Sequence, residues 1–128
     1  MELRLAPLRT ARLRLEPLSA EMARAILAGD LSGLVTVGGT VIGDIGTHGP
    51  VDEAGGVEIG YGLAAPSRGQ GYGSEAVAAV TEWLLSQPGV RQVRAHTLTS
   101  NAPSRRVLEK AEFAYVGLEE GEALYQRP

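Results

Sequence analysis

A run of alternating glycines in the second half of the chain places the strongest constraint on its fold. Residues 68–76 read Arg-Gly-Gln-Gly-Tyr-Gly-Ser-Glu-Ala, with glycine at every second position from 69 to 73. Such a run has little side-chain bulk, so that neighbouring N–H groups can point the same way and a ligand can approach the main chain closely. Residues 57–63 before it are typical of a strand, and residues 75–86 after it favour a helix. A strand, a glycine-rich turn and a helix N-terminus in this order predict a binding site for a phosphate group.

Two common phosphate-binding motifs agree less well with these residues. A P-loop ends in Gly-Lys-Ser/Thr, because its lysine reaches the terminal phosphates, whereas this chain has Gly73-Ser74-Glu75 and no lysine nearby. A Rossmann fingerprint fits as Gly71-x-Gly73-x-x-Ala76, but the next strand, at 93–98, carries no acidic residue to hold a ribose. A Rossmann-type nucleotide binder therefore remains a disfavoured alternative.

The stretch Arg68-Gly69-Gln70-Gly71-Tyr72-Gly73 resembles the pyrophosphate loop of the GNAT acyl-CoA N-acyltransferases, whose pattern is Arg/Gln-x-x-Gly-x-Gly/Ala. Residues 101–113, Asn-Ala-Pro-Ser-Arg-Arg-Val-Leu-Glu-Lys-Ala-Glu-Phe, resemble a segment of the branch that acetylates ribosomal protein N-termini. Residues 10–18 resemble the opening strand of that branch. The similarity spans roughly residues 10–117 and departs from the family pattern at Glu112, where glycine is usual.

The order of expected elements is β-α-β-β-β-α-β-α-β-β, which indicates a mixed α/β (α+β) chain. Alternating residues predict a strand at 12–16, and Ser19 and Gly29 predict the ends of a short helix. Gly38-Gly39 predicts a hairpin turn, and Asn101 predicts the start of the last helix, which runs to about residue 111. The resemblance implies a mainly antiparallel central sheet with helices on both faces and, in this chain, a shortened N-terminal helical region. We expect one domain over residues 1–128, with residues 1–9 as an extra strand or arm.

The composition excludes several classes of function. The net charge of −3 argues against a nucleic-acid surface. Because the chain has no cysteine, disulfides and thiolate catalysis are excluded, and its two histidines show no metal-ligand spacing. The charged residues at positions 2, 4 and 9 are not expected to belong to a signal peptide, and the sequence has no run of about 18 apolar residues. We therefore expect a cytoplasmic protein without a metal, nucleic-acid or membrane partner, and leave a homodimer open.

The resemblance implies that acetyl-CoA is the co-substrate and indicates which residues would hold it. Its pyrophosphate would lie on the glycine loop, formed by Arg68, Gly69, Gln70, Gly71, Tyr72, Gly73 and Ser74. The end of the preceding strand separates from its neighbour in this family, so the main chain of Leu63 and Ala65 would bond the pantetheine amides. Asn101 would bond the pantetheine region as well. A glycine-rich turn that only packs a strand on a helix remains the alternative.

Acetyl transfer to an amine requires the amine to lose a proton and the departing thiolate to be stabilised or protonated. The resemblance makes Glu58 the candidate base, although a glutamate on an exposed strand face would look the same. Leu108 stands where many GNAT enzymes have a tyrosine acid, so Ser104 is the candidate substitute. Asn101 and Ser104 are also ordinary residues for the start of a helix. His96, a lone histidine in a strand, is interpreted as structural.

These observations predict an N-acetyltransferase that moves an acetyl group from acetyl-CoA to a primary amine. The amine would attack directly in a ternary complex, because no cysteine is present to form an acyl-enzyme. The acceptor would be a protein N-terminus or a small amine. A non-catalytic acyl-CoA-binding or interaction module is the alternative, supported by the short N-terminal region and by Glu112.

Overall fold

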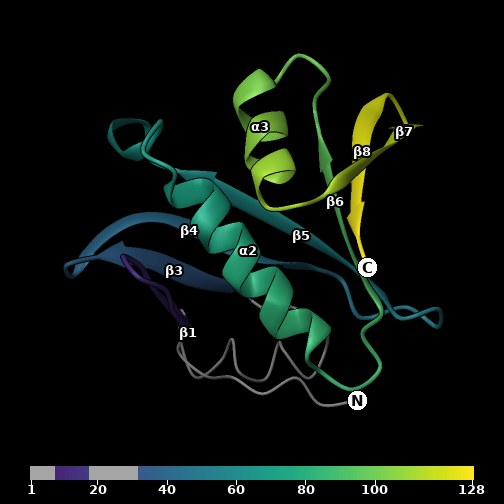
Figure 1. Ribbon diagram of the computed structural model, residues 1–128, viewed down its shortest axis with the longest axis horizontal. Helices are drawn as coiled ribbons and strands as arrows, with labels where there is room; N and C mark the ends of the chain where they lie inside the picture. The colour runs from purple at the N-terminus through teal and green to yellow at the C-terminus, as the bar shows by residue number, and fades with distance from the viewer. Residues whose placement is uncertain (1–7, 18–31) are drawn as a thin grey trace.

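Over the residues that the structure describes, the chain forms one eight-stranded sheet that carries the α-helices α2 and α3 (Figure 1). The computed structural model describes residues 8–17 and 32–128. The strands lie in the order β1-β2-β3-β4-β5-β6-β8-β7. Their bounds are β1 Leu8–Arg9, β2 Arg14–Pro17, β3 Ser32–Val37, β4 Thr40–His48, β5 Gly56–Leu63, β6 Gln92–Thr97, β7 Ala114–Glu119 and β8 Glu122–Arg127.

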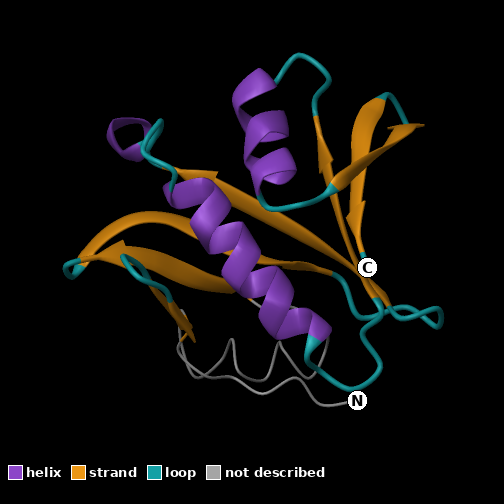
Figure 2. Cartoon of the chain, in the orientation of Figure 1, coloured by secondary structure: helices purple, strands orange, loops and turns teal. Residues whose placement is uncertain are grey.

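The helices follow from the connections that the sheet requires. All neighbouring strands are antiparallel except β5 and β6, which are parallel and are therefore joined by a crossover helix. That helix is α2, Tyr72–Leu85, preceded by a short 3₁₀ turn, η1, at Ala65–Ser67; α3, Ala102–Lys110, connects β6 to β7. Figure 2 shows α2 and α3 in front of the sheet, and the two helices contact each other.

The core lies between this face of the sheet and the two helices. Every second residue of β6 is buried, namely Val93, Ala95 and Thr97, as expected for a strand with one covered face. Val77 and Leu84 of α2 are fully buried against the sheet, as is Leu108 of α3. The helices are thus positioned by apolar stripes, which leaves their N-terminal ends free for other contacts.

The predicted mixed, mainly antiparallel fold class is confirmed. The hairpin at Gly38-Gly39 forms, with both residues at positive φ, and residues 8–9 form an extra strand. The helix α2 begins at Tyr72, earlier than the predicted position 75, so that Gly73 lies in its first turn. The helix predicted at 19–28, and with it the expected helix cover on the second face, lies outside the described residues.

The strands β5 and β6 pair over only a short distance. Their register joins Gly56 to Gln92, Val57 to Val93 and Glu58 to Arg94, and no pair follows. Beyond Glu58, β5 continues to Leu63 along β4, while β6 continues to Thr97 along β8. The facing edges of the two strands therefore separate, as the family resemblance implied, and the main-chain groups on this edge of β5 have no neighbouring strand.

Glu112 occupies a position at which the backbone conformation favours glycine. Its φ is 70°, and it directly follows Ala111, the C-cap of α3. The N–H of Glu112 bonds to the carbonyl of Glu109 (3.0 Å), and that of Phe113 to the carbonyl of Leu108 (2.9 Å). These two bonds form a Schellman motif, in which the left-handed residue is usually glycine. The glutamate that replaces the family's usual glycine at position 112 therefore lies at the C-terminal end of α3.

We expect Glu112→Gly to raise the free energy of unfolding by about 1 kcal/mol, because it relieves the left-handed strain. The change also removes a contact between Glu112 Oε2 and Arg127 Nη2 at 3.4 Å. The Glu112 side chain is exposed, so this ion pair contributes roughly 0–1 kcal/mol. Urea denaturation of Glu112→Gln, which loses the charge but keeps the strain, isolates that contribution. Equal stability of the glycine and glutamine variants would contradict the assignment.

Candidate active site

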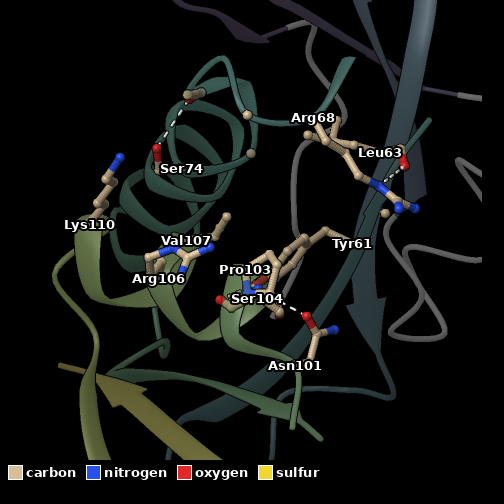
Figure 3. A pocket seen from close by; sticks show the side chains of 14 residues that line it. Tyr61, Leu63, Arg68, Ser74, Asn101, Pro103, Ser104, Arg106, Val107 and Lys110 are labelled. Atoms are coloured by element: carbon tan, nitrogen blue, oxygen red, sulfur yellow. Dashed lines mark hydrogen bonds between the residues drawn. The ribbon is translucent and has the colours of Figure 1, made fainter. Parts of the chain in front are cut away.

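A cleft of about 490 Å³ opens where β5 and β6 separate (Figure 3). It extends from the glycine loop, along the end of β5, to the first turns of α3. Most of the predicted site residues line it: Leu63, Arg68, Gly69, Gly71, Gly73, Ser74, Asn101 and Ser104. Six further lining residues were missed in the sequence: Tyr61, Gly62, Pro103, Arg106, Val107 and Lys110.

The glycine loop presents main-chain N–H groups without an acceptor. In the described part of the chain, the N–H groups of residues 67, 68 and 75 are hydrogen-bonded, whereas none of the six from residue 69 to residue 74 is. Gly69 and Gly71 have φ of 78° and 83°, a region that glycine adopts without strain. Gly71 is the N-cap of α2, so the positive end of the helix dipole adds to these donors. The loop therefore has the geometry of an anion site.

Arg12 fixes the back of this loop. Its Nε donates to Glu75 Oε1 (2.8 Å) and its Nη1 to the carbonyl of Gln70 (3.0 Å), while its guanidinium lies 4.5 Å from the centre of the Tyr72 ring. Thr10 also donates to Glu75. Burial would raise the pKa of Glu75, but the hydrogen bonds from Thr10 and Arg12 outweigh it and hold that pKa below its ordinary value. Gln70 and Tyr72 serve this anchoring and do not line the cleft.

Three cations surround the cleft. Arg68 donates from Nε to the carbonyl of Leu63 (3.0 Å). Arg106 and Lys110 are one turn apart on α3, and in Figure 3 they lie on the side of the cleft nearer Ser74. Their i, i+4 spacing on a helix that begins after Asn101 was the signal that could have identified them.

The free edge of β5 runs along the cleft as far as Leu63. The N–H of Ala64 bonds to the carbonyl of Ile42 (2.8 Å) in β4. Because main-chain groups alternate between the two edges of a strand, those of Leu63 point away from β4. Ala65, predicted beside Leu63, instead begins η1, where its carbonyl accepts from the N–H of Arg68 (3.2 Å), and it does not line the cleft.

A second cleft, of about 510 Å³, adjoins the first. Its walls come mainly from residues 44–48 of β4, Ile59 and Gly60 of β5, and the end of β6. A Cβ on Gly60 would lie 2.0 Å from His48 Nε2, so this glycine makes room for the imidazole. The two clefts share Tyr61, Asn101 and Ser104, which therefore mark the place where a molecule in one cleft would meet a molecule in the other.

These three shared residues are bonded to one another. Asn101 caps α3, its Oδ1 accepting from the N–H of Ser104 (3.1 Å). The hydroxyls of Tyr61 and Ser104 are 2.8 Å apart, and Tyr61 also donates to the carbonyl of Ser104 (3.2 Å). The pair thus joins β5 to α3 across the point where the strands have separated.

Glu58 lies at the last β5–β6 pair, beside His96. Its Oε1 is 3.1 Å from His96 Nδ1, and Glu119 Oε1 is 2.9 Å from His96 Nε2. Burial would lower the pKa of His96, but hydrogen bonds to Glu119 and Glu58 raise it above its usual value. His96 lines the second cleft, whereas Glu58, with 30% of its side chain exposed, lines neither. The histidine interpreted as structural is therefore the member of this pair that faces the cleft.

Two absences apply to residues 8–17 and 32–128. Over these ranges, no group of three or more histidine and acidic side chains could hold a metal ion. None of the helices described there has the length and apolar character to cross a membrane.

The sequence and the fold both match known proteins. The family model for the acetyltransferase (GNAT) domain matches residues 9–114. The chain is 34% identical over 73 residues to YjdG of Bacillus subtilis strain 168, an uncharacterized N-acetyltransferase, covering 57% of this chain but only 44% of that protein. The fold matches the Agrobacterium tumefaciens C58 acetyltransferase at a TM-score of 0.81, with 21% identity over 100% of this chain and 97% of the other.

A further solved structure has a bound ligand. Mycobacterium smegmatis RimJ, in complex with CoA-disulfide, matches at a TM-score of 0.72, with 20% identity over 88% of this chain and 68% of RimJ. At this identity the likeness concerns the fold. The family-model match spans most of the chain, and the chain therefore belongs to the GNAT acetyltransferase family, as its glycine loop predicted.

The contacts of His96 predict a pH-dependent stability. Since its pKa is raised on folding, the stabilisation is fully present below the unfolded value of about 6.5 and is lost as the pH rises through the folded value. We expect the wild type to lose more stability than His96→Gln between about pH 6 and pH 9. Urea denaturation across this range measures the free energy of unfolding of both proteins. The same change with pH in the wild type and in His96→Gln would contradict the prediction.

Proposed function

We propose that the chain binds acetyl-CoA in the first cleft and transfers the acetyl group to a primary amine held in the second. The observation that carries this proposal is that the first cleft leads from an anion site to the second cleft. One end has the six N–H groups of residues 69–74, for which the described part of the chain supplies no acceptor, and the other end has residues shared with the second cleft.

Coenzyme A matches the order of groups along the first cleft. Its pyrophosphate would accept from the N–H groups of the loop, with Arg68, Arg106 and Lys110 contributing positive charge. The pantetheine arm would run along the free edge of β5, where the main chain of Leu63 and the side chain of Asn101 lie. The complex of the similarly folded RimJ with CoA-disulfide supports this choice of ligand.

The thioester of acetyl-CoA supplies an activated acetyl group, and residues of the chain would assist its transfer. Main-chain N–H groups near Leu63 would polarise the carbonyl oxygen. Glu58 would take a proton from the amine, either directly or through His96 or a water molecule, since His96 lies between Glu58 and the second cleft. Ser104 would stabilise the departing sulfur. Without a cysteine in the chain, direct attack by the amine is the simplest route.

The acceptor is a protein N-terminus or a small amine. A cationic acceptor suits the net charge of −3 and the carboxylate of Asp44 in the wall of the second cleft. We place the reaction in the cytoplasm, as expected from the sequence.

A non-catalytic acyl-CoA-binding module is the second candidate. The observation that favours it is the position of Glu58, which lines neither cleft and is bonded to His96. Both candidates predict binding of coenzyme A, but only the enzyme predicts turnover that depends on Glu58.

Gly71→Glu should abolish acetyl-CoA binding, because it places a carboxylate at the anion site and strains a residue with φ of 83°. Calorimetric titration with acetyl-CoA, CoA and NAD measures the effect. Gly39→Glu is the matched control, since Gly39 has φ of 84° and open space around its Cβ position. Failure of the wild type to bind either CoA species would refute the proposal, and NAD binding would favour a Rossmann-type ligand.

Glu58→Gln should lower kcat/KM about 10²-fold or more in an amine acceptor screen, because a glutamine cannot accept the proton. Binding of acetyl-CoA should remain unchanged, as Glu58 does not line the first cleft. Glu53→Gln, at an exposed loop residue, is the control. Turnover equal to that of the wild type would eliminate Glu58 as the base.

A further inference from the structure

The two clefts meet at a pair of hydroxyl groups. Tyr61 extends from the part of β5 that no longer pairs with β6, and Ser104 extends from the first turn of α3. Both residues line both clefts. This inference rests on the proposed function: with coenzyme A in one cleft and the amine in the other, the acetyl group is transferred from sulfur to nitrogen beside this pair. The pair is then close to the atom that receives the acetyl group and to the atom that loses it.

The reaction removes protons from the nitrogen and adds one to the sulfur. As the carbon–nitrogen bond forms and the carbon–sulfur bond breaks, an ammonium acceptor loses two protons in all. One proton goes to the base, and from there to water. The other must leave the nitrogen while the sulfur, which keeps the electron pair of the broken bond, gains one. A group that exchanges protons with both clefts satisfies both needs in one step.

We propose that Tyr61 and Ser104 form a proton shuttle from the attacking nitrogen in the second cleft to the departing sulfur in the first. Ser104 gives its hydroxyl proton to sulfur, Tyr61 replaces it across the 2.8 Å hydrogen bond, and the nitrogen returns a proton to Tyr61. Both hydroxyls end the cycle as they began. The net transfer is one proton from nitrogen to sulfur.

The surroundings of Tyr61 favour a shuttle over simple donation. Burial raises the pKa of Tyr61, only partly offset by its bond to Ser104, so the phenol is protonated when the reaction begins. A free thiol has a pKa of about 8.5 and a tyrosine about 10. Proton loss from Tyr61 to a thiolate is therefore unfavourable unless Tyr61 regains a proton from the nitrogen.

Neither Leu108 nor another tyrosine can take the place of Tyr61 in this pair. Leu108, at the position of the family's tyrosine acid, is fully buried and has no proton to give. Tyr125 is fully buried, with its hydroxyl bonded to Arg105 at 2.9 Å. Tyr72 stacks on Arg12, and Tyr115 is exposed on β7. Of the four tyrosines, Tyr61 is the one that lines the clefts.

The test compares Tyr61→Phe, Ser104→Ala and Ser104→Thr with the wild type, using coenzyme A itself as the probe. Ultraviolet absorbance of the thiolate gives the pKa of the bound CoA thiol. We expect this pKa to rise in Tyr61→Phe and Ser104→Ala, because a hydroxyl that stabilises the thiolate is lost, and to stay near the wild-type value in Ser104→Thr. We expect kcat to fall about 10²-fold in both Tyr61→Phe and Ser104→Ala, and to be largely retained in Ser104→Thr.

Tyr115→Phe is the matched control and should leave both measurements unchanged. Circular dichroism and CoA affinity equal to those of the wild type establish that each variant is folded and loaded. If the wild type fails to bind CoA, the proposed function itself is wrong. If the variants bind CoA normally and keep both the thiol pKa and kcat of the wild type, the shuttle is wrong while the transferase survives.

Discussion

The separation of β5 from β6 after Glu58 is the constraint on which the rest of this structure depends. Up to that residue the two strands are bonded as parallel neighbours, and beyond it each is held by its other neighbour. A strand edge left without a partner in the interior would carry a free-energy cost for every unbonded main-chain group. Here the exposed edge borders a cleft, so that water or a ligand can satisfy it. The same separation lets Tyr61 reach α3 and bond Ser104.

At the glycine loop, the negative charge of Glu75 is balanced by its contacts with Arg12 and Thr10. Glu75 lies in the first turn of α2, where its negative charge would compete with a bound anion for the donors of the loop. Arg12 and Thr10 bind that carboxylate from the opposite side of the loop. The site therefore keeps the helix-stabilising effect of an acidic residue near the N-terminus, while the N–H groups of residues 69–74 remain directed elsewhere.

The sequence predicted the parts of the site that depend on local chemistry. The glycine loop, the cap at Asn101 and the hairpin at Gly38-Gly39 are short patterns whose conformation follows from the residues themselves. What it missed depends on contacts between distant segments. Tyr61 is forty-three positions from Ser104, and His96 contacts acidic residues on two other strands. Ala65 does not line the first cleft because the chain enters η1 at this residue, two positions after the predicted and observed end of β5.

The short β5–β6 junction also divides the sheet mechanically. Strands β1 to β5 form one leaf and β6, β8 and β7 form another, and only three residue pairs of the ladder fasten the two leaves together. Further connections are made by the helices, by the contact between Glu58 and His96, and by the bond between Tyr61 and Ser104. A molecule bound in the first cleft would contact both groups of strands on the side where β5 and β6 have separated. A bound molecule would then restrict the motion of the two groups of strands relative to each other, and this motion would be largest when the cleft is empty.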